Sequence, residues 1–271
     1  MLPKERVIAA LEHREGDRVP IGEIGADWEI TDRAIGRPTY YRSKWREWVA
    51  EWEGRRDEVA LSYGRDIVEI AQKFEWDFVV VPLVPARMKE YKKPEMLGEY
   101  KWRDSSGKVW RYSPKSGGHA MLIEAPPLGV DDIVVPDKVQ IDESRLEALA
   151  HVIKELGSTH FVFGRPPDGT FPWSETVGMQ EFLMRMLTEP EFVSKAVEAS
   201  LRVSIAWIEA MCDIGVDGIL VGTDYCDNRG PIMGPRLFRQ FILPALEHSC
   251  KAAHGKGKFF VKHTDGNMWL I

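Results

Sequence analysis

The chain has 271 residues, and its 36 Lys and Arg against 42 Asp and Glu give a formal net charge of −6. An apolar fraction of 44 % is that of a globular protein with a proper core, which excludes collagen-like, disordered and coiled-coil chains. The mild acidity argues against a nucleic-acid-binding protein, which would present a basic patch. The longest strongly apolar stretches are short, such as residues 77–82, and residues 1–6 already include charged side chains. We therefore expect no membrane span and no secretory leader.

The three cysteines predict no cysteine-based metal or redox motif. Cys212, Cys226 and Cys250 are separated by 14 and 24 positions, so no CxxC pair occurs. Few, widely spaced cysteines are typical of proteins in a reducing compartment, and we expect a cytoplasmic protein.

Hydrophobic periodicity predicts an alternation of helices and strands along the chain. In chain order, the expected helices cover residues 3–13, 43–53, 57–75, 144–156, 174–187, 190–214 and 234–255. The expected core strands cover residues 18–24, 77–82, 160–164, 218–224 and 258–263. Between residues 96 and 125 the pattern changes to an antiparallel hairpin with a Gly-containing turn. Trp45, Trp48 and Trp52 fall at helical spacing, which favours a packing stripe over a ligand cage.

Repeated βα units with apolar strands predict a parallel sheet. No GxGxxG or Walker sequence follows any strand, so the usual nucleotide-binding sites are excluded. Polar residues gather where strands end, which is where a (β/α)₈ barrel places its chemistry. A flavodoxin-like sheet also binds ligands at strand ends, so this pattern leaves both folds open.

The densest group of chemical side chains lies in residues 261–267, directly after the last predicted strand. His263 and Asp265 are two positions apart, so on a continuing strand they face the same side. Such a pair can share a metal ion, or the carboxylate can orient the imidazole for acid–base chemistry. Lys262 and Asn267 flank the pair and are candidate substrate-binding residues. Asp-Gly-Asn is also ordinary turn chemistry, and a turn and a site can coexist here.

Asp224 ends the preceding predicted strand and is a candidate catalytic carboxylate. The alternative for Asp224 is a helix cap or a loop salt bridge, which is the interpretation we favour for Asp227. Cys226 lies in the same loop and offers a soft metal ligand near His263, although a lone loop cysteine is more often unbound.

Four further residues are candidates for binding substrate. Arg165, Asp168 and Trp173 belong to the Gly- and Pro-rich loop after strand 160–164, and Glu23 lies near the end of strand 18–24. These positions predict a substrate cleft, although an ordinary surface loop has a similar composition.

The order of these motifs resembles the uroporphyrinogen decarboxylase superfamily. The resemblance rests on residues 15–20, 215–219, 224, 230–238, 244 and 263–267. It implies a single (β/α)₈ barrel domain over residues 1–271, with a cleft at the carboxyl ends of the strands. The superfamily holds tetrapyrrole decarboxylases, and also zinc-dependent methyltransferases that move methyl groups to or from corrinoid proteins.

The decarboxylase branch of this superfamily is expected to carry an arginine-rich segment after the opening helix, which holds the substrate carboxylates. Here residues 21–29 include Glu23, Asp27 and Glu29 instead, which is the wrong charge for a polycarboxylate. The decarboxylases also place an aspartate where this chain has Val81 and Pro82. Uroporphyrinogen decarboxylase activity is therefore the alternative, and methyl transfer is the favoured function.

The methyltransferase branch binds zinc through a His-x-Cys pair and a later cysteine. In this chain the pair is His263 and Asp265, so a carboxylate replaces the thiolate. Zinc accepts His nitrogen and Asp oxygen and would act there as a Lewis acid. A metal-free site in which His263 and Asp265 act as acid–base groups is the alternative.

The resemblance also implies the other molecules involved. We expect a corrinoid (methylcobamide, a cobalamin-type cofactor) as co-substrate, a small-molecule methyl donor or acceptor, a corrinoid protein as partner, and a homodimer. A non-catalytic barrel that binds a corrinoid or another tetrapyrrole is a further alternative. A closed barrel needs eight parallel strands, and only five are found, so we expect a C-terminally truncated barrel that lacks about three βα units.

Overall fold

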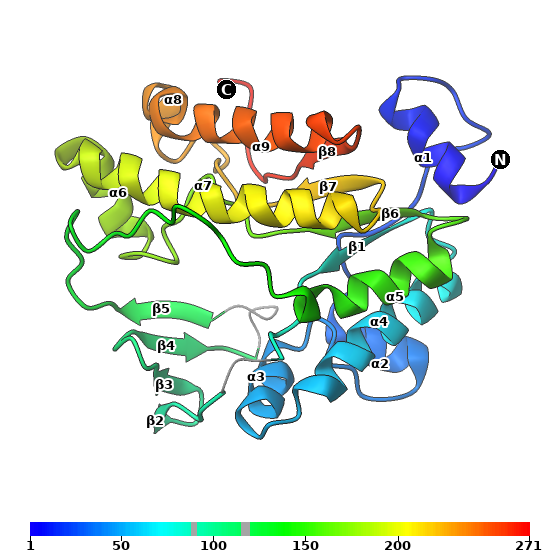
Figure 1. Ribbon diagram of the computed structural model, residues 1–271, viewed down its shortest axis with the longest axis horizontal. Coiled ribbons are helices and arrows are strands. Elements are labelled where there is room, and N and C mark those ends of the chain that lie inside the picture. Colours follow the sequence, from blue (N-terminus) through cyan, green and yellow to red (C-terminus); the bar gives the residue numbers. More distant parts are fainter. Residues whose placement is uncertain (88–90, 115–119) are drawn as a thin grey trace.

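The computed structural model describes residues 1–87, 91–114 and 120–271, and Figure 1 shows them as a parallel sheet, an antiparallel sheet and surrounding helices. The four strands of the parallel sheet lie side by side in the order in which they occur in the chain. They are β1 (Phe78–Pro82), β6 (Phe161–Arg165), β7 (Gly218–Val221) and β8 (Phe259–Lys262). Sequential parallel strands joined by helices are the arrangement of a (β/α)₈ barrel, as predicted.

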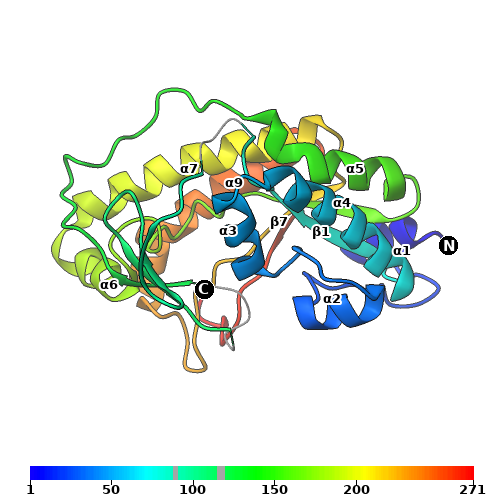
Figure 2. The same ribbon diagram turned by 90° about the horizontal axis from the view of Figure 1, so that it is seen from below.

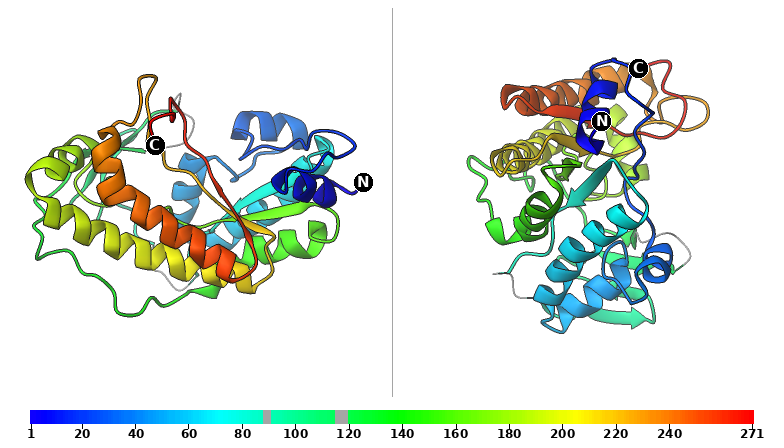
Figure 3. Two further views of the ribbon diagram at one scale, coloured as in Figure 1. Left: turned by 90° about the horizontal axis from the view of Figure 1, so that it is seen from above. Right: turned by 90° about the vertical axis from the view of Figure 1, so that its right-hand side faces the viewer.

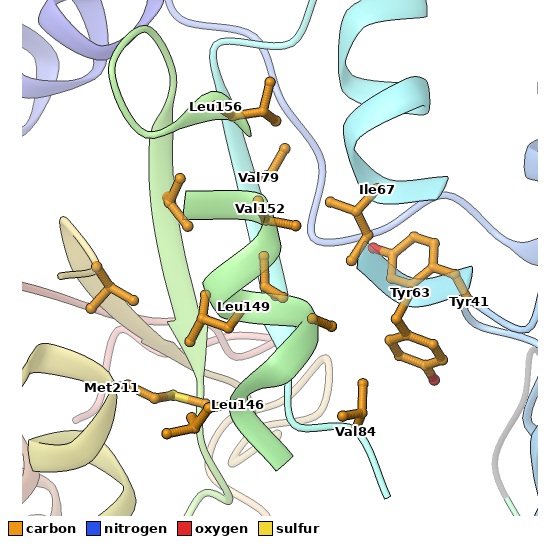
Figure 4. Packing of buried hydrophobic residues seen from close by; sticks show 14 of the residues in the cluster. Tyr41, Tyr63, Ile67, Val79, Val84, Leu146, Leu149, Val152, Leu156 and Met211 are labelled. Carbon is orange, nitrogen blue, oxygen red and sulfur yellow. The ribbon is translucent and has the colours of Figure 1, made fainter. Parts of the chain in front are cut away.

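Helices cover the outer face of this sheet. They are α4 (Arg56–Lys73), α5 (Glu147–Leu156), α7 (Pro190–Asp213) and α9 (Leu243–Gly255). Val79, Leu149, Val152 and Ile67 belong to one buried cluster between sheet and helices, and Figure 4 shows their side chains close together. Each fully buried aliphatic side chain contributes roughly 1.5–3 kcal/mol, so this layer supplies much of the stability.

The inner face of the sheet carries the alternate residues of the same strands. Val80, Phe161, Phe163 and Leu220 form a second buried cluster, against which Val7 of helix α1 (Pro3–Leu11) packs. Because side chains alternate between the two faces of a strand, the inner rows continue to Arg165, Gly222 and His263 where the strands end.

The predicted hairpin is part of a four-stranded antiparallel sheet. Its strands are β2 (Glu95–Gly98), β3 (Lys101–Arg103), β4 (Val109–Tyr112) and β5 (Ala120–Glu124). Helix α3 (Lys44–Trp52) packs against this sheet, with Trp45 stacked on Tyr112 at 5.6 Å and Trp48 near Trp102 at 5.2 Å between ring centres. The predicted packing stripe is therefore confirmed. Figure 2 shows the antiparallel strands toward the same end of the molecule as helix α6 (Met179–Thr188), away from the N-terminus.

Shorter helical elements complete the described residues. They are α2 (Trp28–Ile35), a 3₁₀ helix at Glu143–Leu146, α8 (Gly234–Leu237) and a π-helical turn at Phe238–Ile242. The π turn immediately precedes the segment with Pro244, which has no N–H to continue regular hydrogen bonding, so the helix expected over residues 234–255 is divided into α8, the π turn and α9. No helix within the described residues is long and apolar enough to cross a membrane.

One predicted core strand is wrong. Within the described part of the chain, residues 18–24 make a single parallel bridge, between Gly22 and Phe78. Pro20 has no N–H to donate to a ladder, and the N–H of Ile21 donates instead to the Asp77 carboxylate at 2.6 Å. The helix expected from residue 174 also begins later, at Met179, because the hydroxyl of Thr176 donates to the Pro172 carbonyl in a preceding turn.

Candidate functional site

Asp224, His263 and Asp265 converge at the carboxyl ends of β7 and β8. One potential ligand atom from each residue lies within 4.8 Å of those of the other two. His263 Nδ1 lies 3.8 Å from Asp224 Oδ1, and His263 Nε2 lies 3.6 Å from Asp265 Oδ1. The side chains are 51 % exposed for Asp224, 37 % for His263 and 79 % for Asp265. The three predicted catalytic residues therefore form one group that a substrate can reach.

The two loops that carry this group are held together by hydrogen bonds that backbone N–H groups donate. The N–H of Asp265 donates to Asp224 Oδ1 at 2.9 Å, and the N–H of Tyr225 donates to the Thr264 hydroxyl at 2.8 Å. Asn267 donates its backbone N–H to the Asp227 carbonyl at 2.8 Å, so it fixes the turn. Figure 3 (left) shows the two loops side by side near the C-terminus.

Gly266 is required for this approach of the two loops. Its φ is +92°, and a Cβ there would lie 2.7 Å from the backbone of Cys226 and Asp227. A side chain would therefore separate the loops and the carboxylates that they position.

The donor set fits a divalent metal ion such as zinc, which accepts imidazole nitrogen and carboxylate oxygen. At 3.6 and 3.8 Å the imidazole is too far from either carboxylate for a hydrogen bond, so neither ring nitrogen is committed to Asp224 or Asp265. Asp224 and Asp265 flank the ring from both sides, an arrangement that also suits acid–base chemistry by the imidazole. The geometry thus agrees with both alternatives predicted for His263.

Cys226 lies in the β7 loop but outside this group of potential ligands. It is buried, and burial raises the pKa of its thiol above the ordinary value. A protonated, buried thiol is a poor ligand at neutral pH.

Lys262 and Asp168, two predicted substrate-binding residues, bind each other. Lys262 Nζ lies 2.5 Å from Asp168 Oδ2 and 2.8 Å from the Thr223 carbonyl, and the side chains of Lys262 and Asp168 are only 13 % and 7 % exposed. Asp168 also accepts from the N–H of Thr223 and from the hydroxyl of Thr170. Burial lowers the pKa of Lys262, although the Asp168 charge opposes this effect. The pair joins the ends of β6, β7 and β8.

A cleft of about 990 Å³ lies between these strand ends and the antiparallel sheet. Asp168, Trp173 and Asp224 line it, so the structure places three of the predicted site residues on one cavity. Its other walls include aromatic side chains that sequence reasoning did not assign to a site, namely Trp48, Trp102, Trp110 and Phe171. No local pattern identifies the walls formed by Trp48, Trp102 and Trp110, because they depend on how α3 and the antiparallel sheet lie against the strand ends.

Residues 123–271 match the sequence profile of the uroporphyrinogen decarboxylase (URO-D) family. The chain belongs to this family. It is also similar in structure to a methyltransferase from Methanosarcina mazei, with a TM-score of 0.63 and 19 % sequence identity, over 100 % of this chain and 72 % of that one. At this identity the likeness concerns the fold. No curated protein sequence matches the chain.

This URO-D family chain has an acidic segment at residues 21–29, as the sequence shows, and the structure adds the surroundings of that segment. Asp27 pairs with Arg42 at 3.1 Å, and the exposed Glu23 accepts from the backbone N–H of Ile24 at 2.9 Å. Arg165 lies at the end of β6, where its backbone is in register with Pro82 of β1. Arg42 was not among the predicted site residues, and no motif marks it.

Proposed function

We propose that the chain is a methyltransferase that moves a methyl group to or from a corrinoid (methylcobamide), with a zinc ion held by Asp224, His263 and Asp265. The observation that carries this proposal is the convergence of these three side chains at the ends of two neighbouring parallel strands. The fold likeness to a methyltransferase and the membership in the URO-D family support the same class.

Each residue of the group has a separate task in this proposal. His263 in its neutral form donates a ring nitrogen, and the two carboxylates offset the charge of the ion. Zinc supplies Lewis acidity that lowers the pKa of a thiol or another acceptor. The N–H of Asp265 holds Asp224 Oδ1 in place, so the two carboxylates keep a fixed relation.

The cleft with aromatic walls is suited to bind a large, partly apolar ligand next to the proposed metal site. Asp224 belongs both to the metal group and to the cleft wall, and Trp48, Trp102 and Trp173 present indole rings to the same cavity. Indole rings bind flat or methylated ligands and exclude water. We propose that a corrinoid or a small methyl donor enters here.

The zinc proposal is tested by measuring metal binding. Purified chain is freed of metal, incubated with one equivalent of zinc and dialysed against a competing chelator. We expect the native chain to retain zinc. The zinc affinity should fall at least about tenfold in His263→Ala, because even the loss of a residue that only hydrogen-bonds to a metal ligand lowers metal affinity about tenfold. His248→Ala, an exposed histidine on α9, is the matched control.

Equal zinc retention by His263→Ala and the native chain would contradict the proposed site. Loss of CO₂ from added uroporphyrinogen would favour the decarboxylase alternative, and corrinoid binding without turnover would favour the non-catalytic alternative.

A further inference from the structure

Arg165 and His263 lie beside each other on the inner face of the sheet, with only Gly222 between them. Arg165 follows Phe161 and Phe163 in the inward row of β6, and His263 follows Phe259 and Val261 in that of β8. A Cβ on Gly222 would lie 3.5 Å from Arg165 Nη2 and 3.7 Å from His263 Nδ1. The missing side chain leaves a space that both groups face.

The guanidinium of Arg165 has no hydrogen-bond acceptor and no ion-pair partner among residues 1–87, 91–114 and 120–271. The nearby Asp168 carboxylate is already occupied by Lys262, Thr170 and Thr223. Burial lowers the pKa of Arg165, and the positive charge of Arg42 lowers it further. A half-buried arginine without a counter-ion is costly, because its lost hydration is not replaced.

Arg42 brings a second cation to the same place. Its Nε is buried and has no hydrogen-bond partner in the described part of the chain, while its Nη2 pairs with Asp27 at 3.1 Å. The neighbouring Tyr41 is 3 % exposed, and burial raises the pKa of its hydroxyl to about 12, so it remains a hydrogen-bond donor. A Cβ on Gly25 would lie 2.5 Å from the Tyr41 hydroxyl oxygen and 3.3 Å from Arg42 Nε, so these two groups lie side by side. The positive charges of Arg42 and Arg165 both lower the pKa of this hydroxyl, against the larger effect of burial.

We propose that Arg165 and Arg42, with the Tyr41 hydroxyl as a further donor, bind an anionic group of the substrate whose reacting atom lies at His263. A carboxylate, sulfonate or phosphate matches the planar guanidinium donors and replaces the missing counter-ion. The assignment of a reacting atom at His263 rests on the proposed function, whereas the anion subsite rests on the arginines. These arginines come from the end of β6 and from the segment before α3, not from residues 21–29.

Calorimetric titration of the metal-free chain with propionate, ethanesulfonate and inorganic phosphate tests the subsite directly. We expect saturable binding of at least one of these anions, and Arg165→Gln should weaken it at least about tenfold, the loss expected for a charged hydrogen-bonding group. Arg165→Lys should restore part of the affinity, because it keeps the charge but not the two-pronged geometry. Arg202→Gln, an exposed arginine of α7 paired with Glu198, is the matched control.

Glu23→Gln provides a second variant whose expected effect has the opposite sign. It removes an exposed negative charge that raises the pKa of the Tyr41 hydroxyl, and it should therefore tighten anion binding. Because this variant is expected to gain affinity, the subsite can still be judged if Arg165→Gln fails to fold. Absence of saturable binding, or equal affinity in the native chain and both variants, would overturn the subsite. Since the titration contains neither zinc nor corrinoid, its result is independent of the zinc measurement, and either proposal can fail while the other stands.

Discussion

At the scale of single residues, we propose that position 265 sets the affinity of the site for a metal ion. Asp265 occupies the place at which the resemblance to the zinc methyltransferases implies a cysteine. Its carboxylate oxygen lies 3.6 Å from His263 Nε2, so the residue is placed to share an ion with the imidazole. A carboxylate is a harder ligand than a thiolate and selects zinc less strongly against other divalent metals.

Asp265→Cys is expected to tighten zinc binding about tenfold or more, because the thiolate is the softer ligand that zinc favours. Competition with a chromophoric chelator measures the affinity. Asp227→Cys is the matched control, since Asp227 lies in the adjoining loop and outside the group of potential ligands. Unchanged or weaker zinc binding in Asp265→Cys would show that position 265 does not contact the ion.

At the scale of elements, the ends of three strands are joined by one buried ion pair. Asp168 follows β6, Thr223 follows β7 and Lys262 ends β8, and the Lys262 ammonium contacts both of the others. The same ammonium lies 4.1 Å from the centre of the Tyr225 ring. Lys262 points away from His263, because successive side chains of a strand face opposite sides. The pair therefore positions the loops that carry the site.

Asp168→Asn is expected to lower the free energy of unfolding by about 3 kcal/mol, because it leaves the buried Lys262 ammonium without its counter-charge. Urea denaturation followed by circular dichroism measures this loss. The double variant Asp168→Asn with Lys262→Met should recover part of the stability, since both charges are then absent. A loss below about 0.5 kcal/mol, as for an ordinary surface substitution, would contradict this role.

The elements also show what the sequence alone can predict. The strands β1, β6, β7 and β8 were predicted because their apolar runs are continuous, as buried parallel strands require. The apolar residues of segment 18–24 favour a strand, but Pro20 has no N–H to donate, and among the described residues the segment makes a single bridge. The convergence of Asp224, His263 and Asp265 is predictable because each lies within three positions of the end of β7 or β8, two neighbouring parallel strands.

The rest of the site depends on contacts between distant segments. Arg42 and Tyr41 precede α3 and carry no motif, yet both act electrostatically on Arg165, which is more than 120 positions further along the chain: the charge of Arg42 lowers the pKa of Arg165, and Tyr41 raises it. Trp48 belongs to a helix stripe that packs on the antiparallel sheet, and the same ring also faces the cleft. A helical period indicates that such a residue is buried, but not which cavity lies beside it.

At the scale of the whole molecule, the cleft lies between two sheets of different construction. The loops at the ends of the parallel strands supply the polar groups, and α3, β3 and β4 supply the aromatic side chains of Trp48, Trp102 and Trp110. Figure 1 shows the two sheets and α3. Asp224 is a polar group of the strand ends that also lines the shared cavity, so a ligand in the cleft contacts the candidate metal group directly. This arrangement connects a URO-D family fold with the methyl transfer that we propose.

The most direct test of this account is the rate at which the zinc-loaded chain demethylates methylcobalamin in the presence of a thiol, 3-mercaptopropionate or mercaptoethanol. The change in the visible spectrum of the corrinoid follows the reaction. The account predicts turnover by the native chain and by His248→Ala. In His263→Ala the rate should fall by about 100-fold or more, because zinc no longer activates the thiol acceptor. Equal rates in the native chain and His263→Ala, or no turnover by a zinc-loaded native chain, would contradict it.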